Sequence, residues 1–201
     1  MAKPSVVASQ IGIKIDSKSL PAESFGLLAE ASVDQHAYLP HHFALRFYDP
    51  GLKLLDGELF QLTGKVEINA QDGDGKEVVL IEGEITSIEP DFKEGMNAEL
   101  VVRGYDISHH LYRITNSTTY LNSKDSDLAN KIAKKIGLKT DIETTATVYD
   151  HIYQDNQSDL HFLMQRAWRI GYECYVDSGT LHFHLPRNKA GESKLFHSLI
   201  L

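Results

Sequence analysis

A change in hydrophobic periodicity near Asp106 constrains the fold of this chain more than any other feature. Before it, apolar and polar residues alternate, so that Phe43, Leu45 and Phe47 fall on one face of an expected strand. After it, apolar residues recur every three to four positions, which is typical of amphipathic helices. The two patterns predict antiparallel strands first and a helix-containing region second.

The first region is expected to hold several consecutive strands. Alternation predicts strands over residues 43–48, 58–70, 78–88 and 98–105, with turns at 71–75 and 89–95. The first of these turns is rich in Asp and Gly and predicts a hairpin, because both residues tolerate the positive φ of tight turns. Successive antiparallel strands without helices between them favour a barrel or a sandwich.

The second region is expected to hold two helices and further hairpins. Asp125 to Asp127 supply capping oxygens for the first helix, which ends at Gly137, and Ser158 caps the second, which ends at Gly171. The apolar stripe of the second helix comprises Leu160, Leu163, Met164, Ala167 and Trp168. A strand is expected at 147–153, and a hairpin is expected from strands at 172–176 and 181–185.

Charge and cysteine content exclude several classes of protein. The 201 residues include 20 Lys or Arg and 28 Asp or Glu, and the resulting charge of −8 argues against general nucleic-acid binding. The single cysteine, Cys174, excludes an internal disulfide and is expected to be a buried apolar residue. No apolar run is long enough to span a bilayer, and the apolar stretch near the start of the sequence is too short for a secretory signal. We expect a protein made in the cytoplasm, without stable membrane insertion.

Two histidines, His182 and His184, are candidate metal ligands. His182 and His184 alternate on one strand and share a face, which brings two imidazoles near one another. The residues between and beside them are apolar, so the histidine pair is expected on the solvent side, near Glu173 and Tyr175. We expect no bound metal there.

Other candidate chemistry is weaker. The adjacent pairs His41-His42 and His109-His110 would diverge in a strand, and the Asp-Gly stretch at 72–75 lacks the oxygen ligands of a calcium loop. No nucleophile elbow and no phosphate-binding loop occurs. The sequence therefore predicts no catalytic, cofactor-binding or metal-ligating residue, and no enzyme activity.

An ordered series of local patterns is more specific. It comprises Glu82–Pro90, Leu100–Asp106, Asp125–Leu138, Tyr153–Leu163 and Gly171–Leu181. Together these segments resemble the VgrG and phage late-control protein D family, the hub or spike-base proteins of contractile injection systems, which are similar to the contractile-phage baseplate hub. The resemblance covers about residues 40–185, and the last two segments are its most specific parts.

The resemblance implies an α+β, mainly β fold. Residues 1–106 would form an antiparallel, tube-like β-barrel, the first hub barrel, and residues 107–186 a helix-containing α/β region with two helices and hairpins. Residues 187–201 would be a linker and the start of a second barrel that this chain does not complete. The chain would then be a fragment of a longer hub or a shortened relative.

The implied function is structural, namely joining a hexameric inner tube to a trimeric spike. Expected partners are two further copies in a homotrimer, the inner tube ring, and spike-tip and baseplate proteins, with effector cargo as a further candidate. The assembly would be a phage tail, a type VI secretion apparatus or an extracellular injection particle, delivered outside the cell or into a target cell on firing.

Two other classes stay open: a tail-associated cell-wall hydrolase, and a β module that binds a sugar or a peptide. Trp168 is expected to pack in the core, and the alternative is an anchor in a protein interface.

Overall fold

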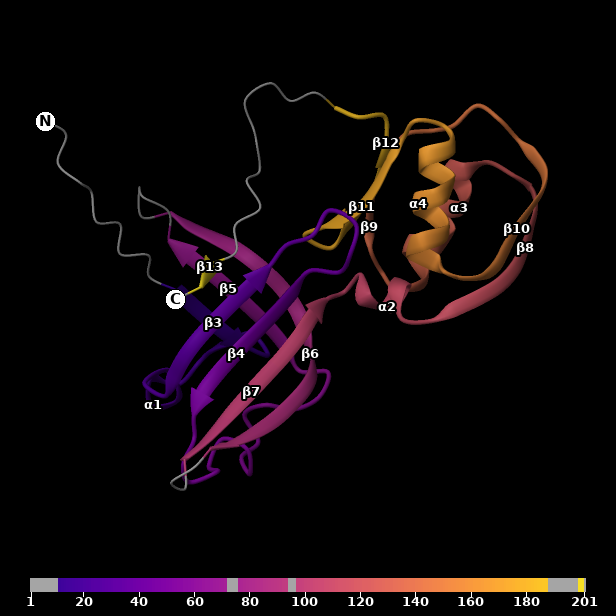
Figure 1. Cartoon of the computed structure of the whole chain (residues 1–201). Helices are drawn as coiled ribbons and strands as arrows, with labels where there is room; N and C mark the ends of the chain where they lie inside the picture. The colour runs from indigo at the N-terminus through magenta and orange to yellow at the C-terminus, as the bar shows by residue number, and fades with distance from the viewer. Residues whose placement is uncertain (1–10, 72–75, 94–96, 188–198, 201) are drawn as a thin grey trace, which may run out of the picture. The chain divides into compact units, whose positions relative to one another are not determined.

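The computed structural model describes residues 11–71, 76–93, 97–187 and 199–200 (Figure 1). Two compact units divide the chain. Unit 1 comprises residues 1–34, 42–105 and 198–201, and unit 2 comprises residues 35–41 and 106–197. Each unit has its own hydrophobic core, so the units are described separately.

Unit 1 is built on one curled antiparallel sheet (Figure 1). Its eight strands follow the order β13-β3-β4-β7-β6-β5-β1-β2. Their bounds are β1 Ile11–Ile15, β2 Lys18–Ser19, β3 Leu28–Asp34, β4 His42–Tyr48, β5 Lys65–Gln71, β6 Glu77–Lys93, β7 Asn97–Asp106 and β13 Leu199–Ile200. A single helical turn, α1 (Ala22–Phe25), lies between β2 and β3. The expectation of a mainly β fold that begins with antiparallel strands is confirmed.

The core of unit 1 follows from the alternation seen in the sequence. In β4 the side chains of Phe43, Leu45 and Phe47 are fully buried, while the residues between them are partly exposed. Because β4 lies between β3 and β7, its buried face contacts apolar side chains from both neighbours, including Val33 and Val102. The expected strand at 43–48 is therefore confirmed.

Two strand boundaries differ from expectation. β5 begins at Lys65 rather than at residue 58, because Thr63 has a left-handed φ of +68°, which interrupts extended backbone. β6 continues through Pro90 to Lys93, where a turn was expected. β5 pairs with β6 only as far as Glu84, so Pro90 lies beyond that pairing, where a missing N–H costs no bond to β5. The expected hairpin turn at 71–75 falls mostly outside the described residues.

Unit 2 contains both long helices and two small sheets. The helices are α3 (Asp125–Lys135) and α4 (Asp159–Arg169), and α2 (His109–Tyr112) is a single turn. One sheet pairs β8 (Thr115–Ser123) with β10 (Tyr149–Ser158). The other has the order β11-β12-β9, with β9 at Lys139–Ile142, β11 at Glu173–Asp177 and β12 at Thr180–His184. The expected α/β character with two helices and a hairpin is confirmed.

The core of unit 2 lies between the helices and the three-stranded sheet. The predicted stripe of α4 is confirmed for Leu160, Leu163, Met164 and Ala167, none of which is more than 7% exposed. Both helices end at a glycine with positive φ, Gly137 at +74° and Gly171 at +72°, as the sequence predicted. Among the described residues, no helix has the length and apolar character needed to cross a membrane.

Candidate interaction surfaces and buried polar clusters

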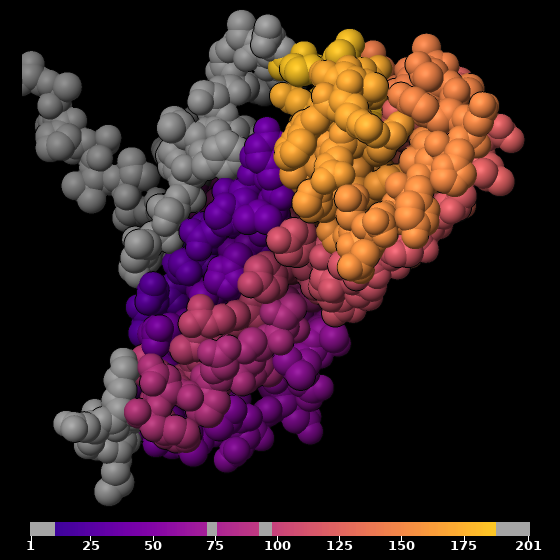
Figure 2. Space-filling model, turned by 45° about the vertical axis from the view of Figure 1, so that its right-hand side comes forward, coloured from indigo at the N-terminus to yellow at the C-terminus, as the bar shows by residue number. Residues whose placement is uncertain are grey.

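An aromatic hollow opens on the surface of unit 2 between β10 and α4. Its volume is about 640 Å³, and its walls carry Tyr153, Phe162 and Trp168 together with Arg166 and Arg169. The segments that form it lie in the orange part of the surface in Figure 2. Aromatic and arginine side chains together are typical of protein interfaces, because they combine a large apolar area with directional polar groups.

Trp168 projects from this surface instead of packing in the core. Its side chain is 54% exposed, and Tyr38 meets it edge to face with ring centroids 6.0 Å apart. The expectation that Trp168 packs in the core is therefore wrong. The helical spacing placed it beside the buried stripe, but Trp168 lies at the edge of that stripe, next to the fully buried Ala167.

The segment Gln154–Leu163 is a polar junction that turns β10 into α4. A bulge interrupts the pairing of β10 with β8 between Gln154 and Gln157, and Asn156 there has a φ of +44°. The fully buried amide of Gln154 donates to the Asp159 carboxylate at 2.9 Å and to the Gln157 carbonyl at 3.0 Å. Asp159 also accepts from Lys135 at 3.0 Å, which ties the junction to the end of α3. These residues have a structural role in unit 2, because their polar groups form hydrogen bonds with one another.

Asp125 and Arg166 form a buried ion pair between α3 and α4. The Arg166 Nε donates to the Asp125 carboxylate at 2.5 Å, and the two side chains are 9% and 1% exposed. The guanidinium also lies over the ring of Tyr149, 4.5 Å from its centroid. The sequence suggested Asp125 as a helix cap, but its main contact is this arginine 41 positions away.

Cys174 is fully buried in β11, as the sequence predicted. Burial raises the pKa of its thiol to about 12, because the surroundings disfavour a thiolate. A nucleophilic or redox role requires an accessible thiolate, so this cysteine serves as a small apolar side chain.

His182 and His184 lie on one face of β12, opposite Tyr175 and Glu173 of β11, as expected. Their expected placement on the solvent side is wrong for His184, which is 2% exposed. The sequence also gave no signal for Asp141, which β9 brings opposite His182 by parallel pairing. The Asp141 carboxylate accepts from Arg187 at 2.8 Å and lies 3.1 Å from the Nδ1 of His182. Hydrogen bonding to Arg187, and then to His182, lowers the pKa of Asp141.

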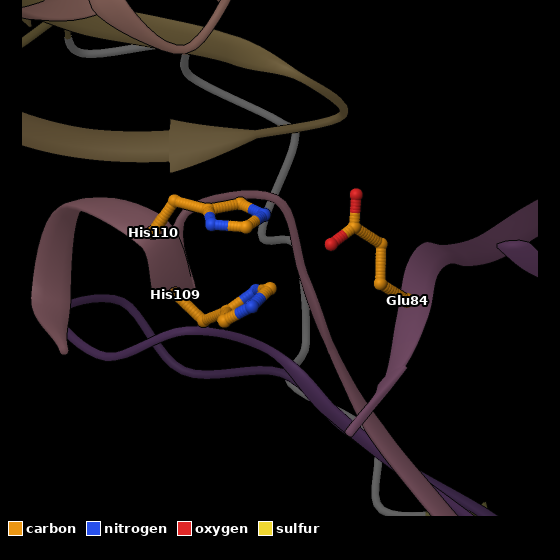
Figure 3. A group of neighbouring side chains, drawn as sticks. All are labelled: Glu84, His109 and His110. Carbon is orange, nitrogen blue, oxygen red and sulfur yellow. The ribbon is translucent and has the colours of Figure 1, made fainter. Parts of the chain in front are cut away.

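His109 and His110 begin α2, and their rings lie against each other with centroids 4.1 Å apart (Figure 3). His109 Nδ1 lies 2.7 Å from the backbone carbonyl of Asp106. Burial raises the pKa of the Asp106 carboxyl, although its hydrogen bond from Ser108 acts in the opposite direction. Glu84, the third side chain drawn in Figure 3, belongs to β6 of unit 1.

Solved structures with a similar fold are phage-tail and type VI secretion proteins. The 43 kDa tail protein of prophage MuSo2 from Shewanella oneidensis aligns with 88% of this chain and 53% of its own, at 15% identity and a TM-score of 0.67. The E. coli c3393 protein is described as a component of the type VI secretion system that is similar in structure to the T4 tail proteins gp27 and gp5. It aligns with 85% of this chain and 48% of its own, at 14% identity and a TM-score of 0.60.

A half-lidded Francisella PdpA–VgrG complex has a chain that aligns with 88% of this one and 31% of its own, at 14% identity and a TM-score of 0.54. This chain therefore spans about half, or less, of the length of the structures it resembles. The expected resemblance to VgrG and phage-tail hubs is confirmed in the fold.

No curated protein sequence matches the chain. A family model described as the Alg8 N-terminal domain matches residues 51–196 of the 201. The match spans the second half of unit 1 and nearly all of unit 2. The chain therefore belongs to the Alg8 N-terminal domain family.

Proposed function

We propose that this chain is a structural hub component of a contractile injection system or phage tail, which joins a hexameric inner tube to a trimeric spike. The observation that carries the proposal is the fold, which tail and VgrG proteins share over 85–88% of the chain. The hub acts mechanically, by transmitting force through permanent contacts, and no catalytic step is part of the proposal.

Exposed apolar side chains of unit 2 support a role in assembly. Leu121, Tyr153 and Trp168 are 63%, 53% and 54% exposed, and the last two line the aromatic hollow. Permanent interfaces bury apolar area of this kind, and tryptophan and tyrosine often carry much of their binding energy. We assign this surface to contacts with neighbouring subunits or tube proteins.

The proposal is tested first by oligomeric state. The complete natural polypeptide, purified alone, should form a trimer by light scattering, and it should co-sediment with assembled rings of the tube protein. Imaging of the particle should place three copies at the junction of tube and spike. A stable full-length monomer that joins neither tube nor spike refutes the hub assignment.

The surface is tested by a matched pair of variants. Tyr153→Ser combined with Trp168→Ser should reduce trimer formation or co-sedimentation about tenfold or more, because two expected anchors are lost. His161→Ser, on an exposed turn of α4, should leave assembly unchanged. Normal assembly of the double variant would show that this surface is not part of the interface, and it would leave the result of the first test unchanged.

A tail-associated cell-wall hydrolase is the competing class. Purified protein should leave peptidoglycan intact over hours, at concentrations where a known lytic enzyme clears it. A hub, in contrast, would reside in the assembled particle. PdpA, which is complexed with VgrG in the Francisella structure, is a model for the cargo of such a hub. Lysis that depends on acidic residues of this chain would favour the hydrolase.

A further inference from the structure

Against the expectation from the sequence that the two histidines bind no metal, we propose that Asp141, His182 and His184 form a binding site for one divalent transition-metal ion, with Zn²⁺ as the ion that fits best. The carboxylate comes from β9 and the two imidazoles come from β12, so three ligands arise from two paired strands of unit 2. Two imidazoles and a carboxylate are ligands that zinc commonly takes in proteins, with water in a fourth position.

The distances agree with tetrahedral coordination. Ligand atoms bonded to one zinc ion at ~2.1 Å lie roughly 3.4 Å apart at the tetrahedral angle. Asp141 Oδ2 lies 3.1 Å from the Nδ1 of His182 and 3.8 Å from the Nε2 of His184, values that bracket this separation. All three ligand atoms lie within 4.8 Å of one another. The longer contact, at 3.8 Å, is too long for a hydrogen bond.

The tautomer of His184 suits a ligand. Its Nδ1 lies 2.8 Å from the backbone carbonyl of Leu185, which can only accept, so Nδ1 carries the proton in the neutral ring. Nε2 then carries the lone pair, and this nitrogen lies 3.8 Å from Asp141 Oδ2. Metal-bound histidines are commonly fixed in this way, through a hydrogen bond from the other ring nitrogen to a carbonyl.

The rings are held in place by their surroundings. His184 has a side chain only 3% exposed, whereas His182 and Asp141 are 20% and 37% exposed, which leaves a route for an ion. Tyr175 stacks on His182 with ring centroids 4.6 Å apart and an interplanar angle of 13°. The two imidazole rings are therefore held in place before an ion arrives, and they lose little side-chain freedom on binding.

Two groups compete with the ion, namely Arg187 and the Nδ1 proton of His182, which hydrogen-bonds to Asp141 Oδ2 at 3.1 Å and must leave before Nδ1 can bind a metal. The Arg187 guanidinium contacts both carboxylate oxygens of Asp141, at 2.8 Å to Oδ2 and 3.1 Å to Oδ1. Binding of a cation requires Oδ2, so the contact at 2.8 Å must break, while the contact to Oδ1 can remain. Arg187 is half exposed and has room to move.

An ion here would join β9 to β12 through side chains. β9 and β12 share four register positions, and β9 is one of the two edge strands of its sheet. A ligand that binds the folded state alone stabilises it in proportion to the logarithm of its concentration over its Kd. The proposed role of the ion is thus to hold the edge strand β9 against β12.

The test uses the chain purified without a His-tag and stripped of metal with a chelator. Zn²⁺ should bind with one-to-one stoichiometry by calorimetry, and it should raise the Tm. Co²⁺ should give the visible absorption bands of a four-coordinate site. His182→Gln and Asp141→Asn should each weaken Zn²⁺ binding by ~10–100-fold or more. Removal of a residue that only hydrogen-bonds to a metal ligand typically has an effect of this size, and removal of a ligand itself should have at least as large an effect. His182 and Asp141 are chosen because they are partly exposed, whereas loss of the buried His184 could impair folding.

Two further variants complete the design. His151→Gln removes an exposed histidine of β10 beside Asp150 and should change nothing. Arg187→Gln should tighten Zn²⁺ binding, because it removes the competing cation. The proposal is overturned if wild-type protein binds no stoichiometric Zn²⁺, or if His182→Gln and Asp141→Asn bind it as well as His151→Gln does.

Discussion

Leu163 shows at the scale of one residue how the helical stripe holds unit 2 together. Its side chain is fully buried, at 0% exposure, among residues of α3, α4, β11 and β12. Leu163→Ala should lower the free energy of unfolding by about 2–5 kcal/mol, because it removes apolar contacts and leaves a cavity. Urea denaturation measures the loss. Leu121→Ala, at a 63% exposed position, is the matched control and should cost little. A loss below about 1 kcal/mol at Leu163 would contradict a packed core.

The Asp125–Arg166 pair predicts strong coupling between two buried side chains. Arg166→Met alone should cost about 3–5 kcal/mol, because it leaves the Asp125 carboxylate buried without its partner. Asp125→Asn combined with Arg166→Met should cost less than the sum of the two single changes. A double-mutant cycle in urea gives the coupling energy, and additive losses would show that the pair is not coupled.

Cys174 predicts a dependence of stability on alkaline pH. Its pKa is about 12 in the folded protein and about 8.5 in an unfolded chain, so the folded state holds the proton more tightly. This contribution to stability is fully present below the unfolded pKa and is lost as pH rises from there toward 12. Between pH 8 and 10.5, wild-type protein should therefore lose more unfolding free energy than Cys174→Ala. Equal slopes would argue against a buried thiol, as would rapid modification of the native protein by a thiol reagent at pH 8.

At the scale of elements, glycine sets how closely strands of unit 1 approach one another. A Cβ at Gly104 of β7 would lie 2.1 Å from the Glu84 carbonyl oxygen and 2.4 Å from the Phe43 ring. Gly104→Ala should therefore cost ~3 kcal/mol or more, because neither a backbone oxygen nor a core ring can yield cheaply. At Gly26 the nearest atoms are 3.5 Å away, so Gly26→Ala should have little effect. Thermal unfolding compares the two, and equal Tm values would contradict the close approach.

Elements with strong local patterns were predictable, and those set by distant partners were not. The alternation of β4 and the stripe of α4 follow from the burial of one face, which the sequence displays directly. β9 has four residues without alternation in burial, and its parallel pairing with β12 depends on the intervening chain. The sequence therefore gives no sign of the Asp141 cluster, although the alternation of His182 and His184 places both histidines on one face. Trp168 was misplaced for a related reason, since periodicity does not show where the edge of a buried stripe lies.

At the scale of the whole molecule, the two separate cores predict that each unit can unfold without the other. Among the described residues, the buried side chains of the unit 1 core lie between Ile13 and Val102, and those of the unit 2 core lie between Leu111 and Phe183. Leu163→Ala should therefore raise amide hydrogen exchange in α3, α4 and β12 while the amides of β4 keep their protection. Mass spectrometry of exchanged peptides resolves these segments. An equal rise in β4 would show that the chain opens as one cooperative unit.

The same division of cores has a consequence for synthesis on the ribosome. Among the described residues, every buried side chain in the core of unit 1 has been made by Val102, before either long helix exists. At ~5–20 residues per second, translation of residues 106–183 takes about 4–16 s longer. Strand pairing is much faster than this, at roughly microseconds to seconds for small β domains. The strands from β1 to β7 can therefore pair while the helical unit is still emerging, whereas β13 can join β3 only once residues 199–200 have been made. Residues 35–41, which belong to unit 2, complete their contacts later, because the His41 carbonyl accepts a backbone bond from the Asp106 N–H.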